Sequence, residues 1–265
     1  MYSNKEIFQD DFLNKFQKSS LSSLESYQLI NRHDTKYIFS SDLFPVIINQ
    51  LYDNYNILEI NNYIVFHYNN LYFDTNDFYF YYSHHNGKLN RYKIRYRQYN
   101  ETKICYFEIK NKTNKSKTLK ERILQTGIHN SIEGDAQKLI DDTIKDNSLI
   151  LEPSLWVEYS RITLLNKNLP EKLTIDTNLY YRNSNLELSL PGIVIAEVKQ
   201  RQISDKSHFM QIMRNQSIIE MNMSKYCVGT ILTNPGIKYN RFKPKLLMIQ
   251  KLWKNNYGKL KFSSI

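Results

Sequence analysis

The chain has 265 residues, and 41% of them are hydrophobic, so it is long enough to bury a sizeable core. Its formal net charge of +10 at pH 7 indicates an acidic partner, which is nucleic acid, an anionic membrane or a polyanionic small molecule. No Gly/Ser-rich or Pro-rich linker divides the chain, and we expect a single domain over residues 1–265.

Cysteine content and hydropathy exclude two further classes of protein. Cys105 and Cys227 form neither a disulfide framework nor a metal-ligand spacing, and we expect two reduced core thiols. Residues 1–10 are polar and contain no apolar signal segment. No stretch reaches the roughly 20 apolar residues that a membrane-spanning helix needs. The sequence therefore predicts a soluble, cytoplasmic protein.

The N-terminal half begins with helix and continues with strands. One or two helices are predicted within residues 5–30. Ser40–Asp42 is expected to cap a helix that runs to about Tyr52, with Pro45 in its first turn, where the missing N–H is tolerated. His85–Gly87 carries a hairpin turn signal. Strands are predicted at 32–39, 58–60, 64–74, 78–83, 88–99 and 103–112.

The C-terminal half returns to strands after a polar run at 111–120, which is predicted to be an exposed turn. Strands are predicted at 154–165, 171–181, 184–190 and 192–200, and helices at 131–146, 206–222, 225–232 and 242–253. Helices thus lie at the ends and between groups of strands, which predicts an α+β fold with a large antiparallel sheet. Closing that sheet into a β-barrel would remove its exposed edges, and we expect such a closed barrel.

Charged residues follow the alternation of side chains in several predicted strands. Between Arg91 and Arg97 every odd-numbered residue is cationic and every even-numbered one is apolar or aromatic, so this strand has one wholly basic face. Four further strands place charged residues on one face, in these sets: Glu108, Lys110 and Lys112; Arg32, Asp34 and Lys36; Lys172, Thr174 and Asp176; Glu197 and Lys199.

Two arrangements produce this pattern. The first is an ordinary antiparallel sheet with one solvated face, although solvated faces usually mix charge signs because like charges side by side repel. The second is a barrel turned inside out, with a charged lumen and an apolar exterior covered by helices. Cations that face one another across a narrow lumen repel unless a polyanion lies between them. The second arrangement therefore predicts a basic tunnel for a linear polyphosphate or a nucleoside triphosphate.

Two carboxylates, Asp176 and Glu197, would lie among these cations. They are either ion-pair partners of the cations or ligands of Mg²⁺ or Mn²⁺, which prefer oxygen ligands and bridge to phosphate oxygens. The residue pattern leaves both alternatives open. His84 and His85 lie close to Gly87 in the sequence. They are interpreted as turn residues rather than as catalytic bases.

Short motifs in a fixed order give the chain a resemblance to a known family. The motifs are R-x-D-x-K-Y (32–37), Y-F-D-T (72–75), H-x-G-x-x-x-R-x-K-x-R-x-R (85–97), E-x-K (108–110), K-x-R (120–122), E-Y-x-R (158–161), I-D-T (175–177), A-E-V-K (196–199) and S-K-Y (224–226). Together they resemble the VTC domain, the catalytic domain of the vacuolar transporter chaperone polyphosphate polymerases, within the triphosphate tunnel metalloenzymes. The similarity covers about residues 28–233 and leaves 1–27 as an N-terminal helical segment.

The resemblance implies an eight-stranded tunnel, with helices outside and at its ends, and a polymerase that moves the γ-phosphate of ATP to a growing polyphosphate chain. It implies a divalent metal, Mn²⁺ or Mg²⁺, on Glu197, with Asp176 as the second candidate ligand. The residues implied in catalysis are Lys36, Arg95, Arg97, Arg161 and Lys199. Those expected to bind phosphate along the tunnel are Lys110, Lys120, Arg122, Lys172 and Lys225.

Two positions depart from the family pattern. Lys172 stands where eukaryotic members have an arginine, so the charge is kept but the bidentate fork is lost. Asn222 stands where those members have another lysine. Both departures bear more on polymerase activity than on polyphosphate binding. The phosphate-sensing and transmembrane domains fused to the eukaryotic enzymes are not found, so product export would need association with a membrane partner.

Three other functions compete with the polymerase. A tunnel triphosphatase would use water as the acceptor, but those relatives open with an E-x-E-x-K strand, and here the corresponding strand offers only Asp34. A binding module would hold polyphosphate without turnover. A nucleic-acid-binding sheet would stack bases on Tyr92, Tyr96 and Tyr99, yet these lie on the opposite face from the cations or beyond them. We therefore expect ATP and polyphosphate, and not nucleic acid, as partners.

The C-terminal segment, 238–265, is basic and amphipathic. We expect it to pack on the barrel or to plug one of its mouths. A helix that lies on a membrane surface or against a partner is the alternative.

Overall fold

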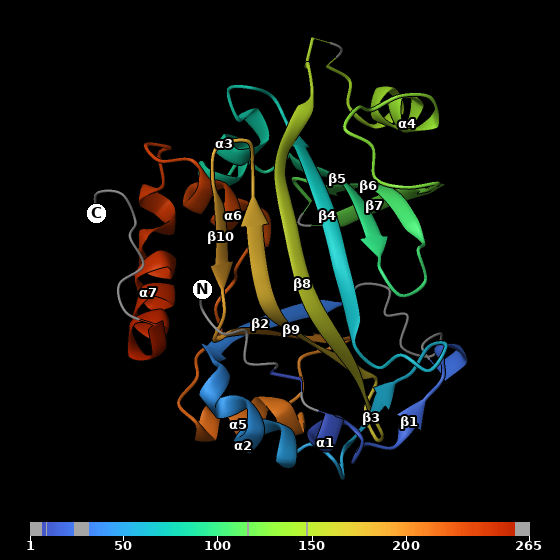
Figure 1. The fold of residues 1–265 in the computed structure, drawn as a ribbon, viewed down its shortest axis with the longest axis vertical. Helices are drawn as coiled ribbons and strands as arrows, with labels where there is room; N and C mark the ends of the chain where they lie inside the picture. The colour runs from blue at the N-terminus through green and yellow to red at the C-terminus, as the bar shows by residue number, and fades with distance from the viewer. Residues whose placement is uncertain (1–6, 9, 24–31, 116, 147, 258–265) are drawn as a thin grey trace.

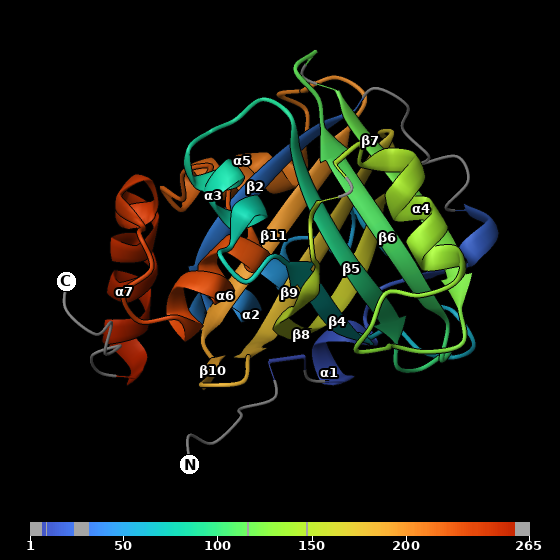
Figure 2. The same ribbon diagram turned by 90° about the horizontal axis from the view of Figure 1, so that it is seen from above.

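The computed structural model describes residues 7–8, 10–23, 32–115, 117–146 and 148–257. They form an α+β fold in which one large, mainly antiparallel sheet carries helices on its outer side and at its ends (Figure 1, Figure 2). The main path of the sheet has the order β2-β11-β9-β8-β4-β5-β6-β7. These strands are β2 (His33–Ser40), β11 (Ile193–Gln200), β9 (Glu171–Arg182), β8 (Glu152–Asn166), β4 (Phe66–Asp74), β5 (Arg91–Tyr99), β6 (Cys105–Lys112) and β7 (Thr118–Gln125).

Short strands and helices complete the fold. Strand β3 (Tyr55–Leu58) pairs antiparallel with β8 and parallel with β1 (Lys18–Ser19), and β10 (Glu187–Leu190) pairs with β9. The helices are α1 (Asp10–Leu13), α2 (Phe44–Asn49), α3 (Tyr79–His85), α4 (Asp135–Thr143), α5 (His208–Asn215), α6 (Lys225–Thr233) and α7 (Lys243–Tyr257). No described helix combines the length and the apolar character needed to cross a bilayer.

The sheet is curled, but hydrogen bonds do not close it into a barrel. Within the described residues, β7 at one end of the path pairs only with β6. At the other end β2 pairs with β11, and the backbone carbonyl of Lys36 in β2 also accepts a hydrogen bond from the backbone N–H of Met221. The predicted α+β fold with a large antiparallel sheet is thus confirmed, whereas the predicted closed barrel is not. The curl still brings β6, near one end of the path, toward β11 and β2 at the other end. Lys110 on β6 accordingly interacts electrostatically with Glu197 on β11 and with Asp34 on β2.

One predicted strand is a helix. Of the predicted strand at 78–83, residues 79–83 form most of α3, and the predicted hairpin turn at 85–87 lies at the end of that helix. The buried carboxylate of Asp74 accepts hydrogen bonds from the backbone N–H groups of Phe80 and Tyr81, at 2.8 and 2.9 Å. Asp74 thus supplies the hydrogen-bond acceptors that the first backbone N–H groups of the helix lack within the helix itself. Because Asp74 lies several residues before the helix, the pattern of apolar residues within 78–83 does not reveal this contact.

The bounds of several other elements differ from the predicted ones. Residues 118–125 form β7, although 111–120 was predicted to be a turn; most β7 side chains are exposed, so the strand lacks apolar alternation. The predicted helix at 206–222 ends at residue 215, close to Ser217, whose φ is +53°. Within the predicted N-terminal helices at 5–30, α1 is short and β1 is a strand, while residues 24–31 lie outside the described ones.

Helices cover the apolar outer face of the sheet, as predicted. Outward residues of β9 and β11, such as Ile175 and Val198, form one buried cluster with residues of α1, α2 and α5. Outward residues of β4, β5 and β6, such as Ile94 and Phe107, form another cluster with Ile140 of α4. Figure 2 shows α4 lying along β6 and β7. The charged residues that alternate with these apolar ones, such as Arg95, Glu108 and Lys199, are therefore directed to the opposite, inner face.

One end of the inner face is apolar and is filled by α6. This cluster contains Leu155 of β8, Tyr181 of β9 and most of α6, and α7 adds Leu246 and Trp253. Within the C-terminal segment, α7 thus packs against this cluster and contacts β2 and β11. The remainder of the inner face, called the lumen below, carries the charged residues of the strands.

We expect Gly229→Ala in α6 to lower the free energy of unfolding by about 1–3 kcal/mol. The added Cβ would lie 2.4 Å from Cδ1 of Tyr181 and 2.7 Å from Cδ2 of Leu155, so the helix would have to move away from the sheet. Urea denaturation measures the change. Gly127→Ala is the matched control, since among the described residues, its two chain neighbours aside, no atom lies within 4 Å of its Cβ position. Equal stability of the two variants would contradict the close packing of α6.

Candidate functional site

The strand registers place the predicted site residues on the inner face. Lys93 on β5 lies opposite Lys110 on β6, and Lys110 lies opposite Lys120 on β7. At the other end of the path, Glu197 on β11 lies opposite Lys36 on β2. Directly opposed residues share a face. By this register the inner face holds Lys36, Arg95, Arg97, Lys110, Lys120, Arg122, Arg161, Lys172, Asp176, Glu197 and Lys199.

Glu108 is the centre of the first charge cluster and is buried. Its Oε2 accepts hydrogen bonds from Nε and Nη2 of Arg95, at 2.9 and 2.6 Å, and its Oε1 lies 2.5 Å from Nζ of Lys120. Arg97 Nε lies 3.8 Å from Oε2. Burial alone would raise the pKa of Glu108, but these three cations hold its pKa well below the usual value. The sequence pattern placed Glu108 among the cations but did not identify this central role.

Asp176 is the centre of the second cluster. Arg161 binds it with both arms of its guanidinium, Nε to Oδ1 at 2.5 Å and Nη2 to Oδ2 at 2.7 Å, and Lys225 at the start of α6 binds Oδ2. Burial opposes ionisation, but the two cations lower the pKa of Asp176 to about 2. Both carboxylate oxygens are therefore engaged by cations, and of the two alternatives for Asp176 these contacts favour the ion pair.

Glu197 is the centre of the third cluster, with Lys36 Nζ at 2.6 Å from its Oε1 and Lys199 on its Oε2. Burial disfavours its charge, yet Lys199 and Lys36 hold the pKa of Glu197 well below its usual value. Among the described residues no group of three His, Cys, Asp or Glu side chains is placed to hold a metal ion. A divalent cation here would need phosphate oxygens as further ligands, which is the usual mode for Mg²⁺. Glu197, which faces the lumen, fits that mode.

Lys93, Lys110 and Lys172 are lysines of the inner face that form no ion pair with a described carboxylate. Lys93 Nζ donates a hydrogen bond to Ser224 Oγ at 2.9 Å. Burial, followed by repulsion from neighbouring cations, lowers the pKa of Lys110 to about 8 and the pKa of Lys172 to about 8. The pKa of Lys93 is lowered in the same way, by burial and by the nearby Lys36. The inner face therefore holds lysines that form no ion pair with a described carboxylate.

Two stacked tyrosines support the cations and were not found by sequence reasoning. The rings of Tyr68 on β4 and Tyr159 on β8 are 4.9 Å apart and inclined by 10°. Arg97 and Arg161 lie over the Tyr68 ring at 5.4 and 5.0 Å, and Lys225 lies over the Tyr159 ring at 4.6 Å. Such contacts fix each cation and contribute roughly 0.5–2 kcal/mol. The only signal in the sequence was Tyr159 in the E-Y-x-R motif.

Two residues of β4 orient the arginines of β5. Arg97 Nε donates to Asn70 Oδ1 at 2.9 Å, and Arg95 Nη1 donates to the Tyr72 hydroxyl at 2.7 Å. Asn70 is itself buried and donates to the backbone carbonyl of Val157. Neither Asn70 nor Tyr72 is charged, so charge patterning alone did not identify them.

The remaining predicted residues have less enclosed surroundings. Arg122, on the exposed strand β7, lies over the Tyr106 ring at 4.5 Å. His84 in α3 is half-buried, and desolvation followed by the charge of Lys93 lowers the pKa of His84 to about 3. It is therefore neutral at pH 7, with its Nε2 lying 3.0 Å from the backbone carbonyl of Tyr92.

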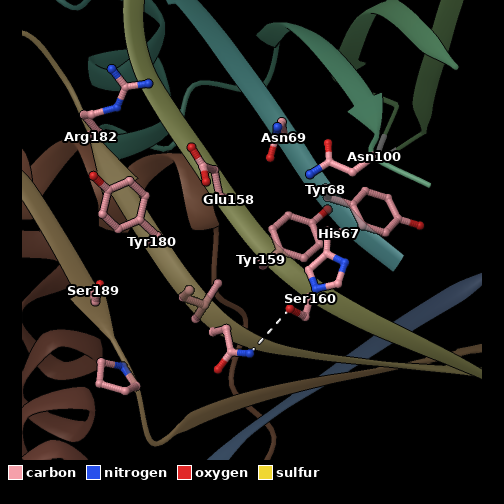
Figure 3. A pocket seen from close by; sticks show the side chains of 13 residues that line it. His67, Tyr68, Asn69, Asn100, Glu158, Tyr159, Ser160, Tyr180, Arg182 and Ser189 are labelled. Atoms are coloured by element: carbon pink, nitrogen blue, oxygen red, sulfur yellow. Dashed lines mark hydrogen bonds between the residues drawn. The ribbon is translucent and has the colours of Figure 1, made fainter. Parts of the chain in front are cut away.

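A polar cleft of about 660 Å³ lies on the other face of the same strands (Figure 3). It is lined by His67 and Asn69 of β4, Glu158 of β8, and Tyr180 and Arg182 of β9. Asn69 lies opposite Glu158, and Glu158 lies opposite Tyr180, so this set shares the outer face. The cleft contains none of the predicted site residues, and the charge clusters identify the lumen as the candidate site.

Comparisons with known proteins give one family. The family model of the VTC domain matches residues 31–234. A comparison with curated proteins finds no match.

Among solved structures, the chain is similar to a presumed adenylate cyclase from Bacillus halodurans, with 17% identity, a TM-score of 0.46, and coverage of 74% of this chain and 96% of that one. It is also similar to a presumed adenylyl cyclase from Hippeastrum that has a dominant triphosphatase activity, with 11% identity, a TM-score of 0.44, and coverage of 80% and 100%. At these scores the structural likenesses support no inference about function.

Proposed function

We propose a function on one premise: the chain belongs to the VTC domain family. The function is that of a polyphosphate polymerase, which transfers the γ-phosphate of ATP to a growing polyphosphate chain inside the basic lumen. The observation that carries this proposal is that cations from several strands share the inner face, and that Lys93, Lys110 and Lys172 among them form no ion pair with a described carboxylate. A chain of phosphates is a polyanion long enough to contact cations from several strands at once, and it would supply the missing negative charge.

The proposed reaction needs no nucleophilic side chain. A terminal oxygen of the acceptor polyphosphate attacks the γ-phosphorus of ATP and forms a new P–O–P bond. The bond from that phosphorus to the oxygen that bridges the β- and γ-phosphates breaks, and ADP leaves with the electron pair. The lumen has to align donor and acceptor and to neutralise charge, which is the main requirement of phosphoryl transfer.

The arginines are proposed to grip the reacting phosphates. Arg95, Arg97 and Arg161 are already fixed by Tyr72, Asn70 and the stacked tyrosine rings, so little side-chain entropy is lost when a phosphate binds. Planar guanidinium groups bind phosphate oxygens in a bidentate manner. Lys110, Lys120, Arg122, Lys172 and Lys225 are proposed to hold phosphates along the lumen, with Lys36 and Lys199 next to the reacting groups.

A divalent cation, Mn²⁺ or Mg²⁺, is proposed to be held by Glu197 together with phosphate oxygens. When bound, such an ion would neutralise charge on the oxygens of the transferred and leaving groups. Lys36 and Lys199, which now neutralise Glu197, would be free to turn toward the phosphates. Asp176, with both oxygens on Arg161 and Lys225, is proposed to orient these two cations.

The closed tunnel predicted from the sequence also belongs to this proposal. A polyanion between the cations of β2 and β11 and those of β5 and β6 would attract both ends of the sheet path and hold the curl together. A cytoplasmic location, and association with a membrane partner for export, are proposed on the same basis as the polymerase itself.

We expect the chain, incubated with ATP and Mn²⁺, to produce ADP and long-chain polyphosphate, which gel electrophoresis separates from free phosphate. Release of free phosphate alone would contradict the polymerase and indicate a tunnel triphosphatase. Binding without turnover would contradict it as well and indicate a binding module.

A matched pair of variants links any product to the lumen. Lys110→Met should lower polymer synthesis at least about tenfold without breaking an ion pair, since Lys110 forms none with a described carboxylate. Lys138→Met on the exposed face of α4 is the control, since Lys138 Nζ lies 3.0 Å from Asp135 on its own helix and its side chain is 77% exposed.

A further inference from the structure

Two family motifs that carry no predicted site role, Y-F-D-T and the end of S-K-Y, meet inside the structure. Asp74, the third residue of Y-F-D-T, accepts a hydrogen bond on Oδ2 from the hydroxyl of Tyr226, the last residue of S-K-Y. The two residues are 152 positions apart in the chain, and both are buried, at 0% and 2% exposure. The bond thus joins the end of β4 to the start of α6.

The Asp74 carboxylate is held rigidly. Its Oδ1 accepts from the backbone N–H groups of Thr75 and Phe80, both at 2.8 Å, and its Oδ2 accepts from the N–H of Tyr81 at 2.9 Å as well as from Tyr226. A carboxylate that accepts four hydrogen bonds has its position set by strand β4 and helix α3 together. The Tyr226 hydroxyl is therefore attached to a fixed point in the fold.

Tyr226 lies directly beside the groups that enter the lumen from α6. Lys225 precedes it and contacts Asp176, and Ser224 accepts the hydrogen bond of Lys93. The Tyr226 ring also stacks on Tyr72, with ring centroids 5.0 Å apart, and Tyr72 accepts a hydrogen bond from Arg95. A shift of Tyr226 would consequently move cations on both α6 and β5.

We propose that the Asp74–Tyr226 hydrogen bond is a positioning element of the site, which sets where Lys225, Ser224 and Lys93 stand in the lumen. The inference rests on the proposed function insofar as these cations align phosphates. Asp74 and Tyr226 do not touch the lumen ligand in this scheme. They act through Lys225 and through the Ser224–Lys93 hydrogen bond.

Tyr226→Phe tests the inference, because it removes the hydroxyl and keeps the ring that stacks on Tyr72. The matched control is Tyr55→Phe. Tyr55 is also a buried tyrosine whose hydroxyl donates to a buried carboxylate, that of Glu171, 116 residues away. Glu171 starts strand β9 next to Lys172 but points to the outer side of the sheet, away from the lumen, and both variants should lose similar thermal stability.

The first readout needs no ligand. In protein with ¹⁵N-labelled lysine, Tyr226→Phe should shift the Nζ resonances of Lys225 and Lys93, and Tyr55→Phe should leave both unchanged. Unshifted resonances in Tyr226→Phe, or equal shifts in both variants, would overturn the inference. If the resonances shift as expected but the wild-type chain does not bind tripolyphosphate, the proposed function fails and the positioning role stands.

The second readout is kinetic. Tyr226→Phe should lower kcat for polymer synthesis by about fivefold to tenfold while KM for ATP changes by less than about threefold, since alignment rather than total charge is altered. Tyr55→Phe should keep kcat within about twofold of the wild type. A loss of kcat that is equal in both variants would assign the Asp74–Tyr226 bond a merely structural role.

Discussion

Arg95→Ala is expected to weaken tripolyphosphate binding, and to slow polymer synthesis, by at least about tenfold. Arg95 is held on three sides, by Glu108 through Nε and Nη2 and by Tyr72 through Nη1, so its guanidinium is oriented before any ligand arrives. Its removal deletes a preorganised charge-assisted contact, for which a tenfold loss, or about 1.4 kcal/mol, is a low value. Isothermal titration calorimetry with tripolyphosphate measures the affinity.

The same substitution should lower the free energy of unfolding on the order of 2 kcal/mol, because the buried Glu108 loses its strongest partner but keeps Lys120. Arg95→Lys separates the two effects, since it keeps the charge but not the fork, and its affinity should lie between those of the wild type and Arg95→Ala. Arg182→Ala is the matched control on the outer face, where the guanidinium lies over Trp156 at 5.2 Å. Wild-type affinity in Arg95→Ala would refute the assignment of Arg95.

Raising the pH from 7.0 to 9.5 is expected to weaken tripolyphosphate binding by about tenfold or more. The pKa values of Lys110, Lys120 and Lys172 are each lowered to about 8 in the empty protein, chiefly by desolvation, although Lys110 and Lys120 keep solvent-exposed surface. A bound polyanion raises these pKa values, so the contribution of the three lysines to affinity is complete below pH 8 and is lost as the pH rises through and above it. Calorimetric titrations at both pH values measure the loss.

The effect on folding has the opposite sign. Between pH 8 and about 10.5 the unfolded chain binds more protons at these three positions than the folded chain does, so their contribution to stability increases with pH. Weaker binding at high pH therefore does not reflect unfolding caused by these lysines.

A double variant isolates the lysines from the titration of tripolyphosphate itself. Lys110→Arg/Lys172→Arg keeps both charges at pH 9.5, because arginine does not deprotonate in this range. It should lose much less affinity than the wild type over the same interval. An equal loss in wild type and double variant would contradict the role of the lowered lysine pKa values.

Strand alternation was enough to predict which residues share the inner face. The period of two between Arg91 and Arg97 depends only on the geometry of an extended backbone, so it survives in the folded protein whatever surrounds the strand. Helices at 44–49, 135–143 and 208–215 also lie within predicted segments, and the helix at 225–233 extends one residue beyond its predicted end, because local signals such as Pro45 and the cap at Ser224 act over a few residues.

The partners within that face were beyond prediction from the sequence. Asp176 is bound by Arg161 from the adjacent strand and by Lys225 from a helix 49 residues away, and Asp74 is joined to Tyr226 over 152 residues. Helix α3 likewise depends on Asp74 at the end of β4, which no periodicity within 78–83 reveals.

The sequence by itself determined the class of fold, the basic inner face and the identity of the cations on it, because these follow from residue type and from the local geometry of strands. The tertiary structure alone decided which carboxylate pairs with which cation, and which lysines of the inner face form no ion pair with a described carboxylate. It also decided that β7 and β2 are not joined by hydrogen bonds. Such outcomes depend on distances between residues far apart in the chain, and those distances are set only when the sheet curls and α6 fills one end of it.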